Sequence, residues 1–350
     1  MLNSKPPKKI SPARLTILLI VAALAFATAG CGRFAKSKVT VPPRLTPLVE
    51  AEIPQLITEI NRLSAVRSLQ GKIDIQFLDT SFADCGIVEK YRTAEGNFIV
   101  QRPGQIYLAV NAPFGVKIAE MSSDSQRFWV ALYQGDEKYR RFVRGTNNAV
   151  YPKLDTNGAQ PDCGGGDGKK KMEMQRAAVS SISSLRPQHF TDAILVRPVS
   201  LENSKLVYAQ SEAFEEEPDT RKGAKSGARV VRGYYLLVEL EPGEANRARV
   251  LRRFWFDRVS ELRLARIQTY NERGQLMTDV TYSQPQSFGE EGRYKLPAIV
   301  ELTRPQDGYS LRIGFQSPDA AKIDQQWPDE SFVLQNSSNL PEYDLDARKE

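Results

Sequence analysis

Alternation of apolar and polar side chains is the feature of this sequence that most restricts its fold. Between Ser68 and Val110 apolar residues repeat at every second position, as in Ile73, Ile75 and Phe77. A period of two places one row of side chains against a core and the next row toward solvent, as in a β-strand. Short turns separate successive segments of this kind, so the sequence predicts about eleven strands in an antiparallel sheet.

Two segments show helical periodicity instead. Between Leu48 and Val66 apolar residues recur at spacings of three and four, which forms one apolar stripe. Pro54 lies inside this stripe, so the helix either begins there or is kinked. A second helical segment spans 172–195 and is interrupted at Pro187. Because a long twisted meander tends to curl, we predict an α+β fold: an incomplete β-barrel of curled antiparallel sheet, covered by helices, with an apolar cavity between them.

Two long segments are predicted to be loop insertions, at 146–171 and 211–229. The first is rich in glycine, but Gly164–Gly168 follows no buried strand and lacks the Gly-Lys-Ser/Thr ending of a phosphate-binding loop. The second holds three successive glutamates followed by basic and glycine residues, which is typical of an exposed insertion. Residues 336–350 are polar and are predicted to be a disordered tail. The folded domain is therefore expected at 48–335.

The N-terminus has the pattern of a targeting signal. Met1–Arg14 is basic, and Leu15–Phe26 is an apolar run shorter than the ~20 residues of a membrane-spanning helix. Small residues then precede Cys31, an order that resembles a bacterial lipoprotein signal, although Thr28 stands where an aliphatic residue is usual. We predict a signal peptide at 1–30, cleavage before Cys31 and acylation (palmitate) of this cysteine. The alternative is an ordinary secretory signal that leaves a free thiol.

The predicted lipid anchor defines the expected location. Acyl chains on Cys31 would hold the protein on a membrane, since each buried CH2 contributes about 0.8 kcal/mol. The segment 31–47 contains three prolines and no sustained period, so it is expected to be a flexible tether. Gly32 follows the cysteine, and resemblance to enterobacterial signals then favours the outer membrane over the inner. We expect a lipid-anchored protein of the bacterial cell envelope, at the outer membrane and facing the periplasm.

The net charge of +6 is concentrated in the signal region. Four basic residues and no acidic residue lie in 1–30, so the rest of the chain holds 44 basic and 42 acidic side chains. This near balance leaves no basic face for nucleic acid, and no nucleic-acid partner is expected. The expected partners are the membrane and acylated lipoproteins or lipid, with the protein itself a monomer.

The sequence offers no catalytic or metal-binding motif. The chain has one histidine, His189, and this residue is more typical of a helix terminus than of a catalyst or a zinc site. We predict that the protein is not an enzyme and needs no cofactor or metal. Cys85 and Cys163 both lie in predicted loops of an oxidising compartment, where a disulfide between them and two unpaired thiols fit equally well.

Several short sequence motifs resemble those of a known family. They are Ser68–Lys72, Asn97–Phe98, Arg102–Gly104, Asn111–Gly115, Ser183–Arg186, Asn271–Gly274 and Leu296–Pro297. In this order, over about Leu48–Leu334, the chain resembles the superfamily of periplasmic lipoprotein carriers and outer-membrane lipoprotein receptors (LolA/LolB-like). The resemblance implies a half-open barrel that binds acyl chains. The chain is longer than the typical member of this superfamily, and it has Phe114 at the position where the receptor has a leucine.

The resemblance also implies two site regions. At a tip between two strands, Phe114 and Pro113 would touch the membrane or a cargo; the alternative is a turn residue packed against its own hairpin. Inside the barrel, apolar side chains of one strand face would line an acyl-binding cavity. These predicted lining residues are Ile73, Ile75, Phe98, Leu108, Phe128, Val130, Phe254, Phe256 and Ile313.

Two functions fit these expectations. The first is a membrane-anchored lipoprotein that binds acyl chains or lipoproteins in its cavity and acts in lipoprotein localisation. The second is an envelope structural or sensing lipoprotein that uses the same fold, with a filled core, for protein contacts. The two hypotheses differ in whether the space between helices and sheet is open or packed.

Overall fold

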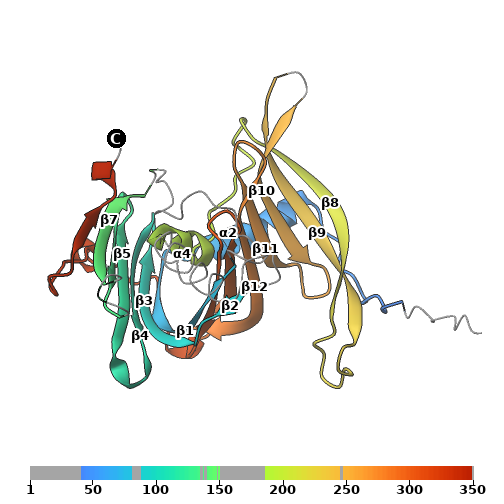
Figure 1. Ribbon diagram of the computed structural model, residues 1–350. Coiled ribbons are helices and arrows are strands. Elements are labelled where there is room, and N and C mark those ends of the chain that lie inside the picture. Colours follow the sequence, from blue (N-terminus) through green and yellow to red (C-terminus); the bar gives the residue numbers. More distant parts are fainter. Residues whose placement is uncertain are drawn as a thin grey trace, which may run out of the picture. The chain divides into compact units, whose positions relative to one another are not determined.

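A single 16-stranded sheet dominates the chain (Figure 1). The computed structural model describes residues 41–80, 88–134, 137, 140–147, 149, 186–244 and 247–348. The strands are β1 (Ser68–Asp79), β2 (Glu89–Lys90), β3 (Ala94–Gln101), β4 (Gln105–Asn111), β5 (Lys117–Asp124), β6 (Arg127–Leu132), β7 (Arg141–Thr146), β8 (Val207–Pro218), β9 (Arg229–Pro242), β10 (Ala248–Asp257), β11 (Arg263–Tyr270), β12 (Leu276–Phe288), β13 (Tyr294–Arg304), β14 (Tyr309–Phe315), β15 (Lys322–Ile323) and β16 (Glu342–Asp344). The α-helices are α2 (Ile53–Ser64) and α4 (Pro187–Ile194), with short 3-10 turns η2 (Pro113–Gly115), η4 (Pro318–Ala320), η5 (Asp329–Phe332) and η6 (Asp346–Arg348).

The sheet consists of two meanders that meet at β1. Its order is β16-β7-β6-β5-β4-β3-β1-β14-β13-β12-β11-β10-β9-β8, with β2 and β15 each paired to β1. All pairs are antiparallel except β16 with β7. The sheet stays unclosed, with β8 at one end, so the predicted curled, incomplete barrel is confirmed. The predicted number of about eleven strands is too low, partly because β2, β15 and β16 are only two or three residues long and show no period, and partly because most of β8 lies in the predicted insertion 211–229.

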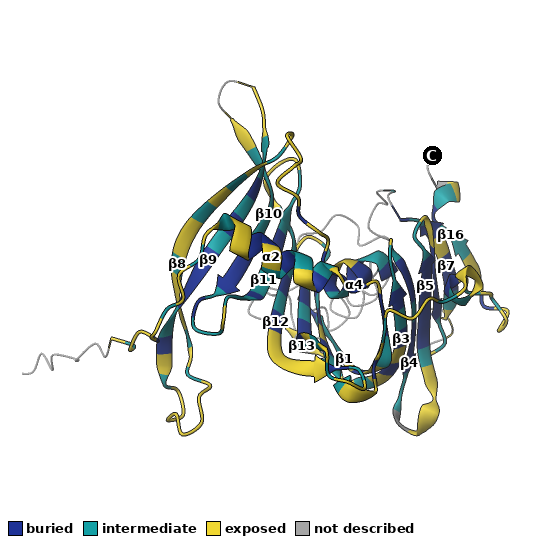
Figure 2. Ribbon diagram, turned by 180° about the vertical axis from the view of Figure 1, so that it is seen from behind, coloured by how far each residue is buried: buried dark blue, intermediate teal, exposed yellow. Residues whose placement is uncertain are grey.

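The two helices lie against the inner face of the sheet (Figures 1 and 2). Pro54 stands in the first turn of α2, so the helix begins there and is not kinked at this proline. The apolar stripe of α2 is buried at Leu56, Ile57, Ile60 and Leu63. These side chains join residues of both meanders in one core, which is the buried inner layer of Figure 2.

The short helix predicted after the interruption at Pro187 is present as α4 and begins at this proline. This proline occupies the first turn of α4, where its missing N–H donor is not needed. Phe190 and Ala193 are buried in the same core as α2. The preceding residues 172–185, predicted to be helical, lie outside the described residues.

The C-terminal segment is folded, which corrects the prediction of a disordered tail at 336–350. Strand β16 pairs with β7, and the N–H of Leu345 donates to the carbonyl of Arg144 at 2.9 Å. Leu340 packs with Trp129 and Phe142 on the outer face of β6 and β7. Strand β6 is apolar on both faces, and the C-terminal segment supplies the cover for its outer face. The segment is mostly polar, so its composition does not indicate that a few apolar residues pack against the sheet.

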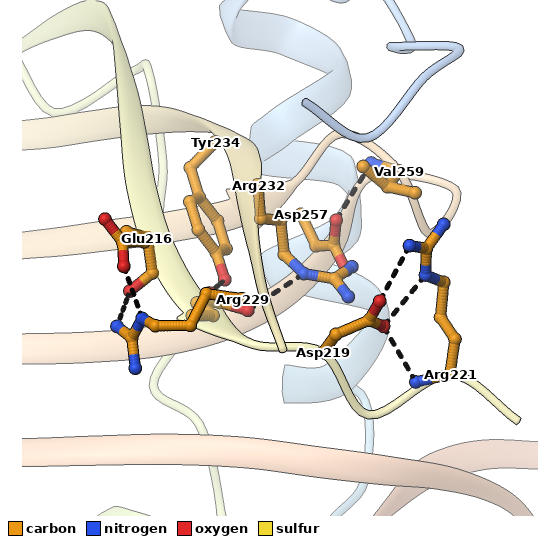
Figure 3. A network of polar contacts seen from close by, with 9 residues as sticks. Glu216, Asp219, Arg221, Arg229, Arg232, Tyr234, Asp257 and Val259 are labelled. Atoms are coloured by element: carbon orange, nitrogen blue, oxygen red, sulfur yellow. Dashed lines mark hydrogen bonds and ion pairs between the residues drawn. The ribbon is translucent and has the colours of Figure 1, made fainter. Parts of the chain in front are cut away.

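Residues 211–218 belong to strand β8, which corrects the predicted insertion at 211–229. Figure 3 shows how the charges of this region pair across strands. Arg229 of β9 pairs with Glu216, and Arg232 contacts both Glu217, at 3.1 Å, and Asp257 of β10, at 2.8 Å. Two of the three glutamates, Glu216 and Glu217, meet an arginine on the neighbouring strand, which lets the run lie in a sheet. Only the connection 219–228 remains as a loop between β8 and β9.

The folded unit begins at Arg44, so the predicted tether ends a few residues earlier than 47. The N–H of Leu45 donates to the carbonyl of Val231 at 2.9 Å, and the Leu45 side chain is buried. The Arg44 guanidinium lies 4.0 Å from the centroid of the Phe214 ring. Local periodicity cannot reveal these contacts because the partners lie far along the chain.

Replacing Ile60 with alanine should test the packing of α2 on the sheet. Ile60 is completely buried, and Ile60→Ala is expected to lower the free energy of unfolding by about 2–5 kcal/mol through the cavity it leaves. Urea unfolding would measure the change. Thr58→Ala, on the exposed side of the same helix, serves as the control and should change stability by less than about 1 kcal/mol. Equal losses in both variants would contradict a packed interface.

Candidate functional site

The nine residues predicted to line a cavity do share one face. They come from β1, β3, β4, β6, β10 and β14, and all of them belong to the core between sheet and helices. The alternation in the sequence therefore assigned the inner face of each strand correctly. Pairing brings members of the two meanders together, since Ile75 lies opposite Ile313 across the β1–β14 junction.

These side chains pack as a core rather than around an open space. Each of the nine is at most 8% exposed. Aromatic rings fill the region near Phe315, whose ring centroid is 5.6 Å from that of Phe98 and 5.0 Å from that of Phe288. Ring pairs at such distances are in direct contact. Among the described residues, the predicted lining positions leave no room for an acyl chain.

A small apolar gap lies elsewhere in the interior, between the ends of both helices and the sheet. Its cavity volume is about 20 Å³, whereas ligand pockets typically measure about 300–1,000 Å³. The residues that line it are Leu63, Val66, Leu69, Ile194, Val196, Tyr282, Leu296, Pro297, Val300 and Phe315. None of the nine predicted residues is among them. Leu63 and Val66 belong to the predicted apolar stripe, but no pattern in the sequence indicates that the helix end borders a gap.

The β4–β5 hairpin presents the predicted tip. Phe114 is fully exposed, with a relative accessibility of 104%, and has a φ of 67°. The left-handed conformation costs an L residue about 1–2 kcal/mol, so the turn holds the ring outward against a local preference. The N–H of Gly115 donates to the carbonyl of Ala112 at 3.2 Å and closes the turn. Exposure of Phe114 agrees with the expectation, and contact of Phe114 and Pro113 with a membrane or cargo stays a prediction.

A buried carboxylate stiffens the strands that carry this tip. Glu120 of β5 accepts hydrogen bonds from the hydroxyls of Tyr107, at 2.7 Å, and Tyr133, at 2.5 Å. Lys117 Nζ donates to the same carboxylate at 2.8 Å. Burial by itself would raise the pKa of Glu120, but the three donors outweigh it and hold this pKa below its usual value. Glu120 therefore stays ionised and links β4, β5 and β6 beneath the tip.

The single histidine is a core residue. His189 lies in the first turn of α4, and its Nδ1 is 2.6 Å from the hydroxyl of Tyr309 in β14. Burial lowers the pKa of His189 well below its ordinary value, and the positive charges of Arg304 and Arg186 lower it further. A neutral, enclosed imidazole of this kind stabilises the contact between α4 and the sheet.

Other predicted site residues lie outside the described part of the chain. These are Cys31, Cys85 and Cys163, so lipidation and the disulfide both stay predictions. Within the described ranges, no group of three or more histidine, cysteine, aspartate or glutamate side chains could hold a metal ion. The helices in these ranges are too short or too polar to cross a membrane.

Comparison with known proteins identifies similar folds. No protein-family model and no curated protein matches the chain. A DUF1329 family protein from Desulfovibrio piger is similar in structure, with a TM-score of 0.40 and 12% identity over 82% of this chain and 96% of its own. A LolA superfamily protein from Nitrosomonas europaea has a TM-score of 0.38 and 10% identity over 81% of this chain and 99% of its own. An outer membrane lipoprotein-sorting protein domain from Vibrio parahaemolyticus has a TM-score of 0.37 and 10% identity over 79% of this chain and 94% of its own.

His189 should make stability depend on pH in a range where few other groups titrate. Folding lowers the pKa of His189. Below about pH 6.5 this histidine is therefore protonated in the unfolded chain but stays neutral in the folded chain. The free energy of unfolding should therefore fall by about 1 kcal/mol between pH 7.5 and pH 5.5. Urea unfolding at both pH values would measure this difference.

The matched variants separate the histidine from its partner. His189→Gln should abolish the pH dependence, because the chain has no other histidine. Tyr309→Phe keeps the imidazole buried and should retain the dependence at a lower overall stability. A wild-type stability that is flat between these pH values would show that His189 is accessible to protons in the folded state.

Proposed function

We propose that this protein is a lipid-anchored envelope protein that acts through its surface, with the curled sheet as a filled scaffold. The observation that carries the proposal is the packed interior: the nine residues expected to line an acyl cavity form a core, and the gap beside them measures about 20 Å³. The second of the two functions expected from the sequence, protein contact on a filled core, is therefore favoured. The signal pattern and Cys31 support the envelope location.

In this proposal the β4–β5 tip is a contact point with the membrane. An exposed aromatic ring next to Val116, which is 49% exposed, offers apolar surface to the headgroup region. Lys117 follows directly, but its Nζ is paired with Glu120, so the contact with the membrane is carried by the apolar side chains. The rigid base around Glu120 supports this role, because a fixed turn binds without the entropic cost of ordering a flexible loop.

A second candidate function is binding of an acyl chain after the helices move. The apolar gap favours it, since this gap lies between the C-terminal ends of α2 and α4, and both helices contribute to its wall. Displacement of α4 would widen the gap toward the inner face of the sheet. This function requires an open state that differs from the packed one.

Binding of a fluorescent fatty acid to the full chain, purified in a non-ionic detergent, should distinguish the two functions. The filled scaffold predicts no saturable binding. Saturable binding with one site per chain would overturn the proposal in favour of the acyl-binding function. In that case Val300→Phe, which fills the gap, should abolish binding, whereas Phe114→Ser, at the exposed tip, should leave it unchanged.

Membrane contact of the tip can be measured with the anchor in place. Phe114→Trp should be quenched by brominated lipids when the full chain is reconstituted into vesicles, above the signal of the three native tryptophans. Leu201→Trp, at another exposed apolar position, is the control and should show no added quenching. If Phe114→Trp shows no added quenching, the tip does not contact the membrane and a protein partner becomes the expected contact.

A further inference from the structure

A groove lies between the β9–β10 hairpin and the β11–β12 hairpin, at the end of the sheet away from the tip. Its volume is about 630 Å³. Strand β10 pairs with β9 from Ala248 onward but with β11 only from Arg252 onward. Residues 248–251 therefore extend past the end of β11, with a bulge between Val250 and Arg252, and the turn after β11 forms the opposite wall. We call this space the hairpin groove.

The charges that line the hairpin groove are unevenly paired. Three arginines, Arg247, Arg249 and Arg253, face two glutamates, Glu241 and Glu272. Arg249 contacts both carboxylates, at 2.5 Å and 3.4 Å, so one guanidinium serves both. Among the described residues, Arg247 and Arg253 then have no carboxylate within ion-pair distance. Two uncompensated positive charges therefore line the same groove.

Arg253 is the more constrained of the two. Its Nε is buried and has no hydrogen-bond partner within the described residues. Its guanidinium carbon lies 5.7 Å from the centroid of the Tyr270 ring, which holds the side chain against one wall. The neighbouring arginines differ: Arg252 pairs with Glu239, and Arg266 pairs with Asp279. The side chain as a whole is only partly buried and lines the groove, so the N–H donors of Arg253 other than the enclosed Nε can donate to an anion bound there.

We propose that the hairpin groove binds a phosphate group, with Arg253 and Arg247 as its ligands. A guanidinium donates two parallel hydrogen bonds to neighbouring phosphate oxygens, and two arginines can neutralise either the single charge of a phosphodiester or the double charge of a phosphate monoester. Val250 and the ring of Tyr270 offer apolar surface to the organic part of such a ligand. The phosphate belongs either to a soluble ester or to a phospholipid headgroup. The site adds a ligand to the surface role proposed above and does not depend on it.

Calorimetric titration of the full chain in a non-ionic detergent would test the site. The probes are glycerol 1-phosphate, short-chain phosphatidylglycerol and, as a neutral counterpart, short-chain phosphatidylcholine. We expect one site per chain for at least one of the two anionic probes. Arg253→Gln should weaken binding about tenfold or more, since it removes a charge-assisted pair of hydrogen bonds. Arg247 is exposed, so Arg247→Gln does not disturb the core, and it should also weaken binding.

Arg273→Gln is the matched control, because it removes the same charge from the β11–β12 turn without lining the groove. Binding of glycerol 1-phosphate supports a site for soluble esters. Binding of phosphatidylglycerol alone supports a headgroup site. The proposal is overturned if neither anionic probe binds, if phosphatidylcholine binds equally, or if Arg273→Gln weakens binding as much as Arg253→Gln.

Discussion

Pairing between β1 and β14 is the interaction on which the rest of the structure depends. It runs from Ile73 opposite Phe315 to Asp79 opposite Tyr309, and it joins the two meanders into one sheet. Residues more than 200 positions apart in the chain are brought together, so closing this pair carries a large entropic cost that the shared core must offset. Without it each meander would expose an additional sheet edge and half of its apolar face.

The filled interior follows from this junction. Because the sheet curls without closing, its inner face is wide enough for α2 and α4 to lie against it, and their apolar sides complete the core. The outer face of β6 needs a separate cover, which the C-terminal segment provides through Leu340. With both faces of β6 covered, the exposed tip and the ends of the hairpins are among the surfaces that remain open to interaction in the described part of the chain.

Charge pairing distinguishes the hairpin groove from the rest of the sheet. Along β8, β9 and β10 several acidic side chains meet an arginine across the strands, as at Arg232 with Glu217 and Asp257 (Figure 3). Exposed pairs of this kind contribute little to stability, but they fix which strands lie together. In the groove the pattern fails at Arg253 and Arg247. Departure from local pairing at a concave surface is typical of a binding site.

The sequence by itself determined which side chains of β1, β3, β4, β6, β10 and β14 face the core, because a period of two leaves only two choices per strand. It also predicted the apolar stripe of α2, whereas for Phe114 it left both an exposed and a packed position open, and the structure shows the exposed one. Only the tertiary structure decided that the Glu215–Glu217 run is a strand, since Arg229 and Arg232, which pair with Glu216 and Glu217, lie on β9. It also decided that the predicted cavity residues close into a core, because packing depends on how the two meanders meet. The same holds for the hairpin groove, whose unpaired charges appear only once separate hairpins are placed side by side.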